Sequence, residues 1–178
     1  PQAVRAGAVL SFGVATGIGS YLVLVTSWTL LLCCAASILV AYSYSAGPVP
    51  LGNIGLGQRL VFLFMGLLMV MATYYVQTTA LTPQAFLAGL PVACLVTAIL
   101  VVNDLRDIEE DRQTGKITPV SRFGVRFGLG SFVLLVAGAY ISVLLWAVVR
   151  PAVFPMLLVL LALPQAYATT RLIGSGGT

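Results

Sequence analysis

Five acidic side chains lie within eight residues of this 178-residue chain, and the chain has no other acids. They are Asp104, Asp107, Glu109, Glu110 and Asp111. Carboxylates spaced three and four residues apart on a helix repel one another, and a bound cation would relieve that repulsion. Sets of oxygen ligands suit Mg²⁺, which shares its coordination shell with water and substrate phosphates. The residue types therefore predict a divalent-cation site beside a phosphate group.

Helix geometry selects three of these acids. If the preceding apolar helix continues to Gly115, a residue type that commonly ends helices, then Asp104, Asp107 and Asp111 fall within an arc of about 60°. Basic residues that could neutralise a diphosphate follow directly: Lys116, Arg122 and Arg126. The alternative is a solvated loop whose charges bind nothing. The absence of acids elsewhere in the chain, and the shared helix face, favour the cation site.

The composition places these acids in a membrane protein. Hydrophobic residues make up 60% of the chain and charged residues 8%, whereas soluble domains carry about 25% charged residues. The apolar runs are continuous, so we expect an all-α polytopic bundle in a lipid bilayer rather than a barrel. The chain has no histidine, which excludes His-ligated metals and Ser-His-Asp catalysis. The net charge of +4 is spread over the loops, and no nucleic-acid partner is expected.

Six segments are long and apolar enough to span a bilayer, which takes about 20 residues. They cover about residues 7–25, 28–44, 60–80, 83 to the acidic stretch, 129–149 and 151–170. Thr82 followed by Pro83 has the pattern of an N-cap with proline at the first helical position, and it predicts the start of the fourth span. With six spans, eight of the nine basic residues fall on one side of the membrane, and Arg150 alone falls on the other. By the positive-inside rule that side is cytoplasmic. The loop 104–128, with the acidic stretch, is therefore predicted to lie in the cytoplasm.

The run Asn103–Lys116 resembles the second aspartate-rich motif of the UbiA superfamily of intramembrane prenyltransferases. It is most similar to the branch that prenylates 1,4-dihydroxy-2-naphthoate. Two further segments resemble the same branch: Gly47–Leu51 with Gly55–Gly57, and Thr73–Gln77. Gln58 departs from the family pattern, because an acid is usual at that place, and Asp104 stands where Asn is also common.

The resemblance implies a role for each matching residue. Asp107 and Asp111 would be the catalytic, metal-binding pair. Asn103 and Asp104 would support it, with Asp104 also near the metal. Arg106 and Lys116 would contact the diphosphate or brace the loop. The third span would present Tyr74 and Gln77 to the substrate, although polar residues there are equally typical of helix packing.

The family fold implied is a bundle of about nine spans around a central cavity, with two aspartate-rich motifs facing each other. Residues 1–100 contain no acid, so this chain carries the second motif alone. Its six spans resemble the third to the eighth of the family. Because the chain begins at Pro1 without Met, residues 1–178 are expected to be part of a single prenyltransferase domain in a longer protein. The fragment by itself is expected to be inactive.

The reaction implied is Mg²⁺-dependent transfer of a prenyl group from a polyprenyl diphosphate to 1,4-dihydroxy-2-naphthoate, with loss of CO₂ and diphosphate, in menaquinone or phylloquinone biosynthesis. The location implied is a bacterial plasma membrane or a plastid membrane. Two alternatives stay open. The acceptor could be another aromatic compound, such as 4-hydroxybenzoate, homogentisate or a chlorophyllide. The chain could also be a non-catalytic, quinone-handling subunit of a membrane complex.

Overall fold

The structure is a computed structural model that describes residues 2–45, 50–149 and 151–174, and these residues are almost entirely helical. The elements in chain order are α1 (Gln2–Val25), α2 (Trp28–Ser45), η1 (Leu51–Asn53), α3 (Gly57–Leu60), η2 (Val61–Leu68), α4 (Met69–Thr78), α5 (Pro83–Arg106), α6 (Ile108–Thr114), α7 (Pro119–Phe123), α8 (Val125–Val149), η3 (Pro151–Ala162) and α9 (Leu163–Gly174). Among the described residues the β contact is an isolated parallel bridge, Ile54 with Ile117.

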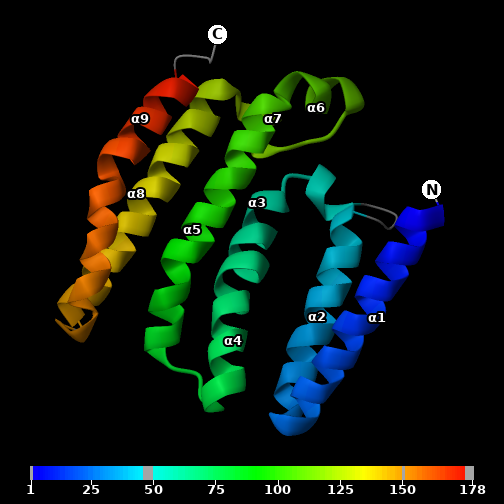
Figure 1. The fold of residues 1–178 in the computed structure, drawn as a ribbon. Helices are drawn as coiled ribbons and strands as arrows, with labels where there is room; N and C mark the ends of the chain where they lie inside the picture. The colour runs from blue at the N-terminus through cyan, green and yellow to red at the C-terminus, as the bar shows by residue number, and fades with distance from the viewer. Residues whose placement is uncertain (1, 46–49, 150, 175–178) are drawn as a thin grey trace.

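The long helices stand side by side in an up-and-down arrangement (Figure 1). In the described ranges, five helices have the length and composition to cross a membrane: α1, α2, the continuous run α3–η2–α4, α5 and α8. The whole of η2 is a π-helix, and it connects α3 to α4 within the third span. The predicted all-helical membrane bundle is confirmed.

The sixth predicted span differs from the prediction. The structure divides this segment into a 3₁₀-helix, η3, and a separate α-helix, α9. Neither piece qualifies as a membrane span among the described residues, so the count there is five rather than six. Prolines explain the division: Pro151, Pro155 and Pro164 lie in this segment, and each lacks the backbone N–H that an α-helix needs. Hydrophobicity alone suggested a continuous helix.

Helix α5 lies between the third span and α8 and contacts both (Figure 1). Its start follows local chemistry, because the Thr82 hydroxyl accepts a hydrogen bond from the Ala85 N–H at 3.2 Å and Pro83 occupies the first helical position. This N-cap was predicted from the Thr-Pro pair. Close packing fixes α5 against η2: a Cβ at Gly66 would lie 2.2 Å from the Ala93 Cα. Small residues at such crossings let membrane helices approach closely.

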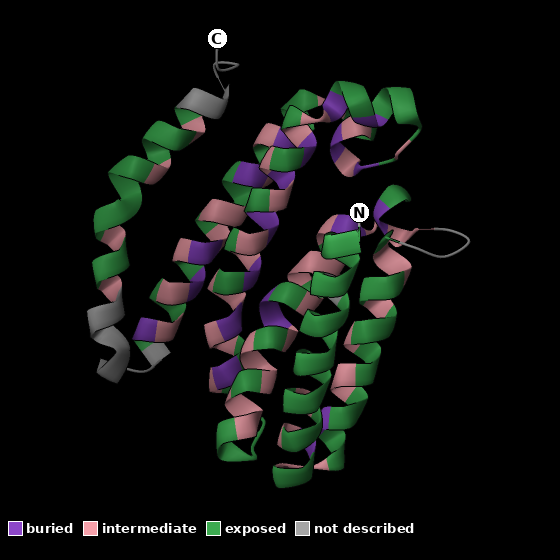
Figure 2. Ribbon diagram, turned by 45° about the vertical axis from the view of Figure 1, so that its right-hand side comes forward, coloured by how far each residue is buried: buried purple, intermediate pink, exposed green. Residues whose placement is uncertain are grey.

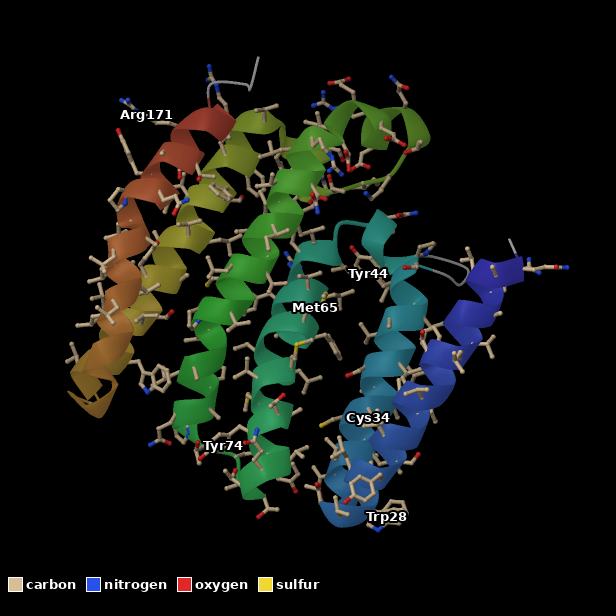
Figure 3. The ribbon with its side chains drawn as sticks, in the orientation of Figure 1. Trp28, Cys34, Tyr44, Met65, Tyr74 and Arg171 are labelled. Carbon is tan, nitrogen blue, oxygen red and sulfur yellow. The ribbon has the colours of Figure 1, made fainter. Side chains whose placement is uncertain are left out.

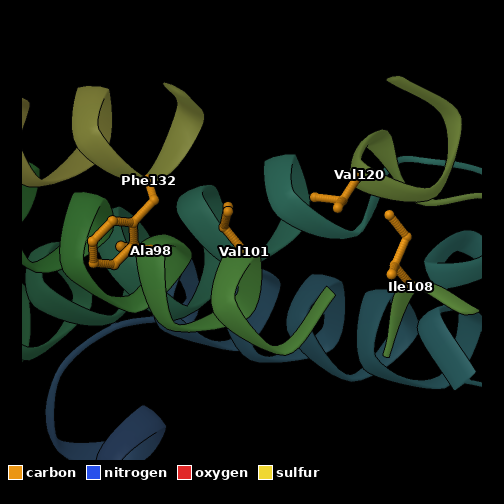
Figure 4. Close-up of a cluster of buried hydrophobic side chains, with 5 residues drawn as sticks. All are labelled: Ala98, Val101, Ile108, Val120 and Phe132. Carbon is orange, nitrogen blue, oxygen red and sulfur yellow. The ribbon is translucent and has the colours of Figure 1, made fainter. Parts of the chain in front are cut away.

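An apolar cluster lies beneath the acidic stretch and joins four elements (Figure 4). Its buried members are Ala98, Val101, Ile108, Val120 and Phe132. Val101 from α5 and Val120 from α7 are fully buried. The cluster therefore ties the short helices α6 and α7 to the ends of α5 and α8, and gives the acidic stretch a rigid base.

The hairpin of α1 and α2 is packed far more loosely (Figure 2). Most of its large apolar side chains are exposed, including Val9, Phe12 and Leu32. In water such a surface would aggregate, whereas in a bilayer it faces acyl chains. The hairpin is tied to the rest of the bundle by a 2.8 Å hydrogen bond between the Ser27 and Tyr75 hydroxyls.

Candidate functional site

The acidic stretch does not continue α5 as one straight helix to Gly115, and that prediction is wrong. Helix α5 ends at Arg106, and Asp107 adopts φ −96° and ψ 12° before α6 begins. The resulting elbow turns α6 away from the axis of α5 (Figure 1). It also buries Ile108 in the apolar cluster, and this burial favours the bend over a straight extension. Gly115 ends α6 with φ +73°, as predicted.

The elbow sorts the three aspartates that were expected on one face. Asp104 and Asp111 are each 4% exposed, whereas the Asp107 side chain is 34% exposed. Charges of Asp107, Asp111 and Lys116 all act on the Asp104 carboxyl. Across the described residues, no three side chains of the His, Cys, Asp and Glu types are grouped closely enough to hold a metal by themselves. The structure thus gives two buried carboxylates with Asp107 at their edge.

Asp104 is held from another helix. The side-chain amide of Gln58, in α3, donates a 2.9 Å hydrogen bond from Nε2 to the Asp104 Oδ2. The segment just before Gln58 also reaches the far end of the acidic stretch, where the Ile117 N–H donates to the Asn53 carbonyl at 2.9 Å. The loop between the second and third spans and the first turn of the third span therefore contact the acidic stretch near Asp104 and just after Lys116.

Asp111 is paired with Lys116. The Lys116 Nζ lies 3.0 Å from the Asp111 Oδ1, while the Asp111 Oδ2 is buried and has no hydrogen-bond partner in the described part of the chain. Burial of Lys116 lowers its pKa, but the hydrogen bond and the charge of Asp111 outweigh burial, so the pKa of Lys116 is raised above its ordinary value. The Tyr44 hydroxyl, at the end of α2, contributes to the same shift. The lysine is therefore charged at neutral pH.

Arg106 and Asn103 take other places. The Arg106 guanidinium donates two hydrogen bonds to Asp107, from Nε to Oδ1 at 2.7 Å and from Nη2 to Oδ2 at 2.9 Å. These bonds lower the pKa of Asp107. Both predicted roles of Arg106, contact with the diphosphate and bracing of the loop, stay predictions. Asn103 is exposed, and its backbone carbonyl accepts the Asp107 N–H, so its side chain is not brought to the buried pair.

A pocket of about 310 Å³ opens beside Asp111. It is lined by Asp111, Arg112, Gly115, Lys116, Ile117, Ser121 and Arg122. Three cations and one buried carboxylate around a space of this size suit a phosphate-bearing ligand. Arg112 is steadied by Glu109, at 3.1 Å, and by the Ser121 carbonyl, at 3.3 Å.

A capping box at the start of α7 forms one wall of this pocket. The Thr118 hydroxyl accepts the Ser121 N–H at 3.0 Å, and the Ser121 hydroxyl accepts the Thr118 N–H at 2.8 Å. Sequence reasoning missed the contributions of Arg112, Ser121 and Gln58. Thr118-Pro119-Val120-Ser121 carries a recognisable capping pattern that would have placed Ser121. Nothing local to Gln58 shows that it meets Asp104.

Tyr74 lies toward the opposite end of the third span from the acids (Figure 3), and Gln77 follows it near the end of α4. Sixteen residues of helix separate Gln58 from Tyr74, which is roughly 24 Å at 1.5 Å per residue. Gln77 lines a second pocket of about 280 Å³ formed with α1 and α2. The structure therefore does not bring these two residues to the carboxylates. At this distance from the carboxylates they do not reach a diphosphate bound there. Their contact with the prenyl tail of a substrate stays a prediction.

Known proteins resemble this chain over most of its length. The chain is 30% identical over 148 residues to the 1,4-dihydroxy-2-naphthoate octaprenyltransferase of Bacillus subtilis, which covers 83% of the chain and 46% of that protein. It is 44% identical over 88 residues to the protein of the same name in Escherichia coli, covering 49% and 29%. It is 29% identical over 152 residues to the 2-carboxy-1,4-naphthoquinone phytyltransferase of Synechocystis, covering 83% and 48%.

The chain thus spans about half the length, or less, of these curated relatives. No solved structure matches it. The sequence model described as the UbiA prenyltransferase family matches residues 1–175, nearly the whole chain. Together with the helical membrane bundle and the acidic stretch at its end, this match shows that the chain belongs to the UbiA prenyltransferase family.

Proposed function

We propose that the protein containing this chain transfers a prenyl group from a polyprenyl diphosphate to 1,4-dihydroxy-2-naphthoate, releasing CO₂ and diphosphate, in menaquinone or phylloquinone biosynthesis. The observation that carries this proposal is the buried Asp111 carboxylate, with its unpartnered Oδ2, beside a pocket lined by three cations at the end of a membrane helix. The names of the relatives from Bacillus subtilis and Escherichia coli support the naphthoate acceptor.

A divalent cation fits the residues at this site. Carboxylate oxygens are the ligands that Mg²⁺ prefers, and Mg²⁺ commonly takes one or two protein carboxylates together with substrate phosphates. The unpartnered Asp111 Oδ2 would supply one such oxygen. Because no three acidic side chains of the described residues are grouped closely enough to hold a metal by themselves, water and substrate phosphates would fill most of the remaining positions. When bound, Mg²⁺ would neutralise charge on the diphosphate and make it a better leaving group.

The residues of the chain do the rest of the work. Lys116, Arg112 and Arg122 line the pocket and bind the diphosphate oxygens, which stabilises the negative charge that develops as the allylic C–O bond breaks. The electron pair of that bond leaves with the diphosphate. The allylic carbon then bonds to the ring carbon of the acceptor that carries the carboxylate, and that carboxylate leaves as CO₂. The apolar bundle below the site excludes water from the allylic carbocation that forms when the C–O bond breaks.

We place the loop 104–128 on the cytoplasmic side of a bacterial plasma membrane or a plastid membrane. The positive-inside rule supports this placement. Arg171 lies at the same end of the bundle as the acidic stretch (Figure 3), as the distribution of basic residues along the sequence requires. A phytyl rather than a longer prenyl donor is a second candidate, favoured by the name of the Synechocystis relative.

The proposal is tested with purified full-length protein in nanodiscs, supplied with Mg²⁺, 1,4-dihydroxy-2-naphthoate and either octaprenyl or phytyl diphosphate. We expect wild-type protein to release CO₂ and form the prenylated naphthoquinol, and Asp111→Asn to reduce the rate at least 1000-fold, about 4 kcal/mol in the barrier. Glu110→Gln removes an exposed acid one residue away and serves as the matched control, with a rate within about twofold of wild type. Full activity in Asp111→Asn would refute the assigned role of this carboxylate.

A further inference from the structure

The loop before the third span and the first turn of that span contact the acidic stretch at two points, one on each side of the elbow. Gln58 donates to the Asp104 Oδ2 at 2.9 Å, three residues before Asp107. Asn53 accepts the N–H of Ile117 at 2.9 Å, immediately after Lys116. Residues 50–58, which we call the clamp, therefore fix the start and the end of the segment that carries both buried carboxylates.

The hydrogen bond from Gln58 has a defined direction. An ionised carboxylate only accepts hydrogen bonds, so the amide must present its NH₂ group to Asp104. Asp104 is 4% exposed. Among the described residues, Gln58 is the one hydrogen-bond partner of its side chain. One oxygen is thereby held by the amide, which fixes the direction in which the other oxygen points.

Gln58 is itself held in place. It follows Gly57, a buried glycine at the start of α3, and a Cβ at Gly57 would lie 3.4 Å from the Tyr44 hydroxyl. The Gly52 backbone packs against the same tyrosine, with a Cβ position 3.2 Å from two ring atoms. The clamp thus packs against the end of α2. Through the clamp, the second and third spans fix the position of the end of the fourth span.

We propose that Gln58 is a positioning residue for the diphosphate site: its amide holds the Asp104 carboxylate in the orientation from which that carboxylate acts on the cation, while Asn53 anchors the Lys116 end of the same segment. The proposal rests on the proposed function and adds a residue from a different helix to it. Groups that orient metal ligands from behind commonly change metal affinity by about 10- to 100-fold when they are removed.

Exchanging the amide and the carboxylate between Gln58 and Asp104 gives a direct test. Gln58→Ala leaves the buried Oδ2 of Asp104 without its donor. Gln58→Glu places two carboxylates within hydrogen-bonding distance, where they repel. Combining Gln58→Glu with Asp104→Asn restores a hydrogen bond of opposite polarity and the original net charge. The exchange therefore separates holding the segment from presenting a carboxylate to the cation.

The experiment uses full-length protein in nanodiscs, with two readouts: calorimetric binding of Mg²⁺ in the presence of inorganic diphosphate, and the melting temperature without ligands. Gln58→Ala should weaken Mg²⁺ binding about tenfold and raise the Mg²⁺ concentration for half-maximal transfer by the same factor, with kcat at saturating Mg²⁺ within about twofold. Gln58→Glu should lower the melting temperature, and the exchange with Asp104→Asn should recover most of that loss without recovering Mg²⁺ affinity. Gln113→Glu adds the same charge to the exposed face of α6 and should change neither readout.

Unchanged Mg²⁺ binding in Gln58→Ala, with wild-type protein active, would overturn the positioning role and leave the function standing. A loss confined to kcat would overturn it too, because a positioning residue for the cation acts on affinity. If wild-type protein transfers no prenyl group, the proposed function fails. The melting temperatures then still decide whether Gln58 holds Asp104, since losses that simply add in the exchanged pair would show that the two side chains are not coupled.

Discussion

Helices α1 and α5 are both 24 residues long and strongly apolar. Of the 18-residue apolar segment that could cross a membrane, however, 33% is buried within the protein in α5, against 6% in α1. The difference shows two ways in which an apolar helix is used. Helix α5 is packed from both sides and ends in a network of charged side chains, so its sequence is constrained at many positions. Helix α1 leaves most of its large apolar side chains exposed, so contacts within the described part of the chain constrain its sequence at few positions.

The largest contrast should come from adding one methyl group to each region. Gly66→Ala places a Cβ 2.2 Å from the Ala93 Cα, so η2 and α5 must move apart, which we expect to cost about 3 kcal/mol. Gly13→Ala in α1 meets no atom within 4 Å and should leave stability unchanged or slightly raised. Unfolding in mixed micelles measures both. Equal effects at the two positions would contradict the close packing of α5.

A smaller contrast concerns two ion pairs at the end of α5. Lys116→Met leaves the Asp111 carboxylate, 4% exposed, without its cation, which should cost about 2 kcal/mol even though the lysine is itself 37% exposed. The matched change Arg106→Met breaks an exposed pair with Asp107, which water screens, and should cost much less than Lys116→Met. The comparison is made by unfolding both variants without ligands at pH 7.

Because the pKa of Lys116 is raised in the folded protein, this pair stabilises the fold fully below the unfolded lysine pKa of about 10.4 and loses its contribution as the pH rises through the folded value. The difference between wild type and Lys116→Met should therefore stay constant from about pH 6 to 9 and shrink above about 10.5. The pKa of Asp107 is lowered, so its smaller contribution is present above about pH 4 and is lost as the pH falls further. A lysine effect that vanished below pH 9 would contradict the pairing.

The smallest contrast tests local capping. Thr118→Val removes the hydroxyl that caps α7 beside the phosphate pocket and should cost about 1 kcal/mol. Thr16→Val removes a hydroxyl that bonds the Phe12 carbonyl on the exposed surface of α1 and should have almost no effect. A larger loss of stability in Thr16→Val than in Thr118→Val would contradict the description of the hairpin as the more loosely packed region.

Features encoded locally were predictable from the sequence. The position of the acids, the first five apolar spans, the Thr82-Pro83 start of α5 and the Gly115 end of α6 depend on neighbouring residues, and the structure has them where the sequence predicts. Helical spacing selected Asp104, Asp107 and Asp111, of which the structure buries Asp104 and Asp111 and leaves Asp107 partly exposed.

Features that depend on distant contacts were not predictable in this way. The elbow at Asp107 has no proline or glycine to mark it, because it arises from the burial of Ile108 against residues of other helices. Gln58 meets Asp104 across 46 positions of sequence. The division of the sixth apolar segment was visible in its prolines, but hydrophobicity outweighed them in the prediction.

The bridge between Ile54 and Ile117 also sets an order of assembly during synthesis. Its two halves leave the ribosome 63 residues apart, and two spans must enter the membrane between them. At roughly 5–20 residues per second this interval lasts roughly 3–13 seconds. During that interval the clamp has been synthesised, but the segment that it contacts is not yet complete. The diphosphate site is therefore completed after translation has passed Ile117, when the hairpin of the third and fourth spans has closed.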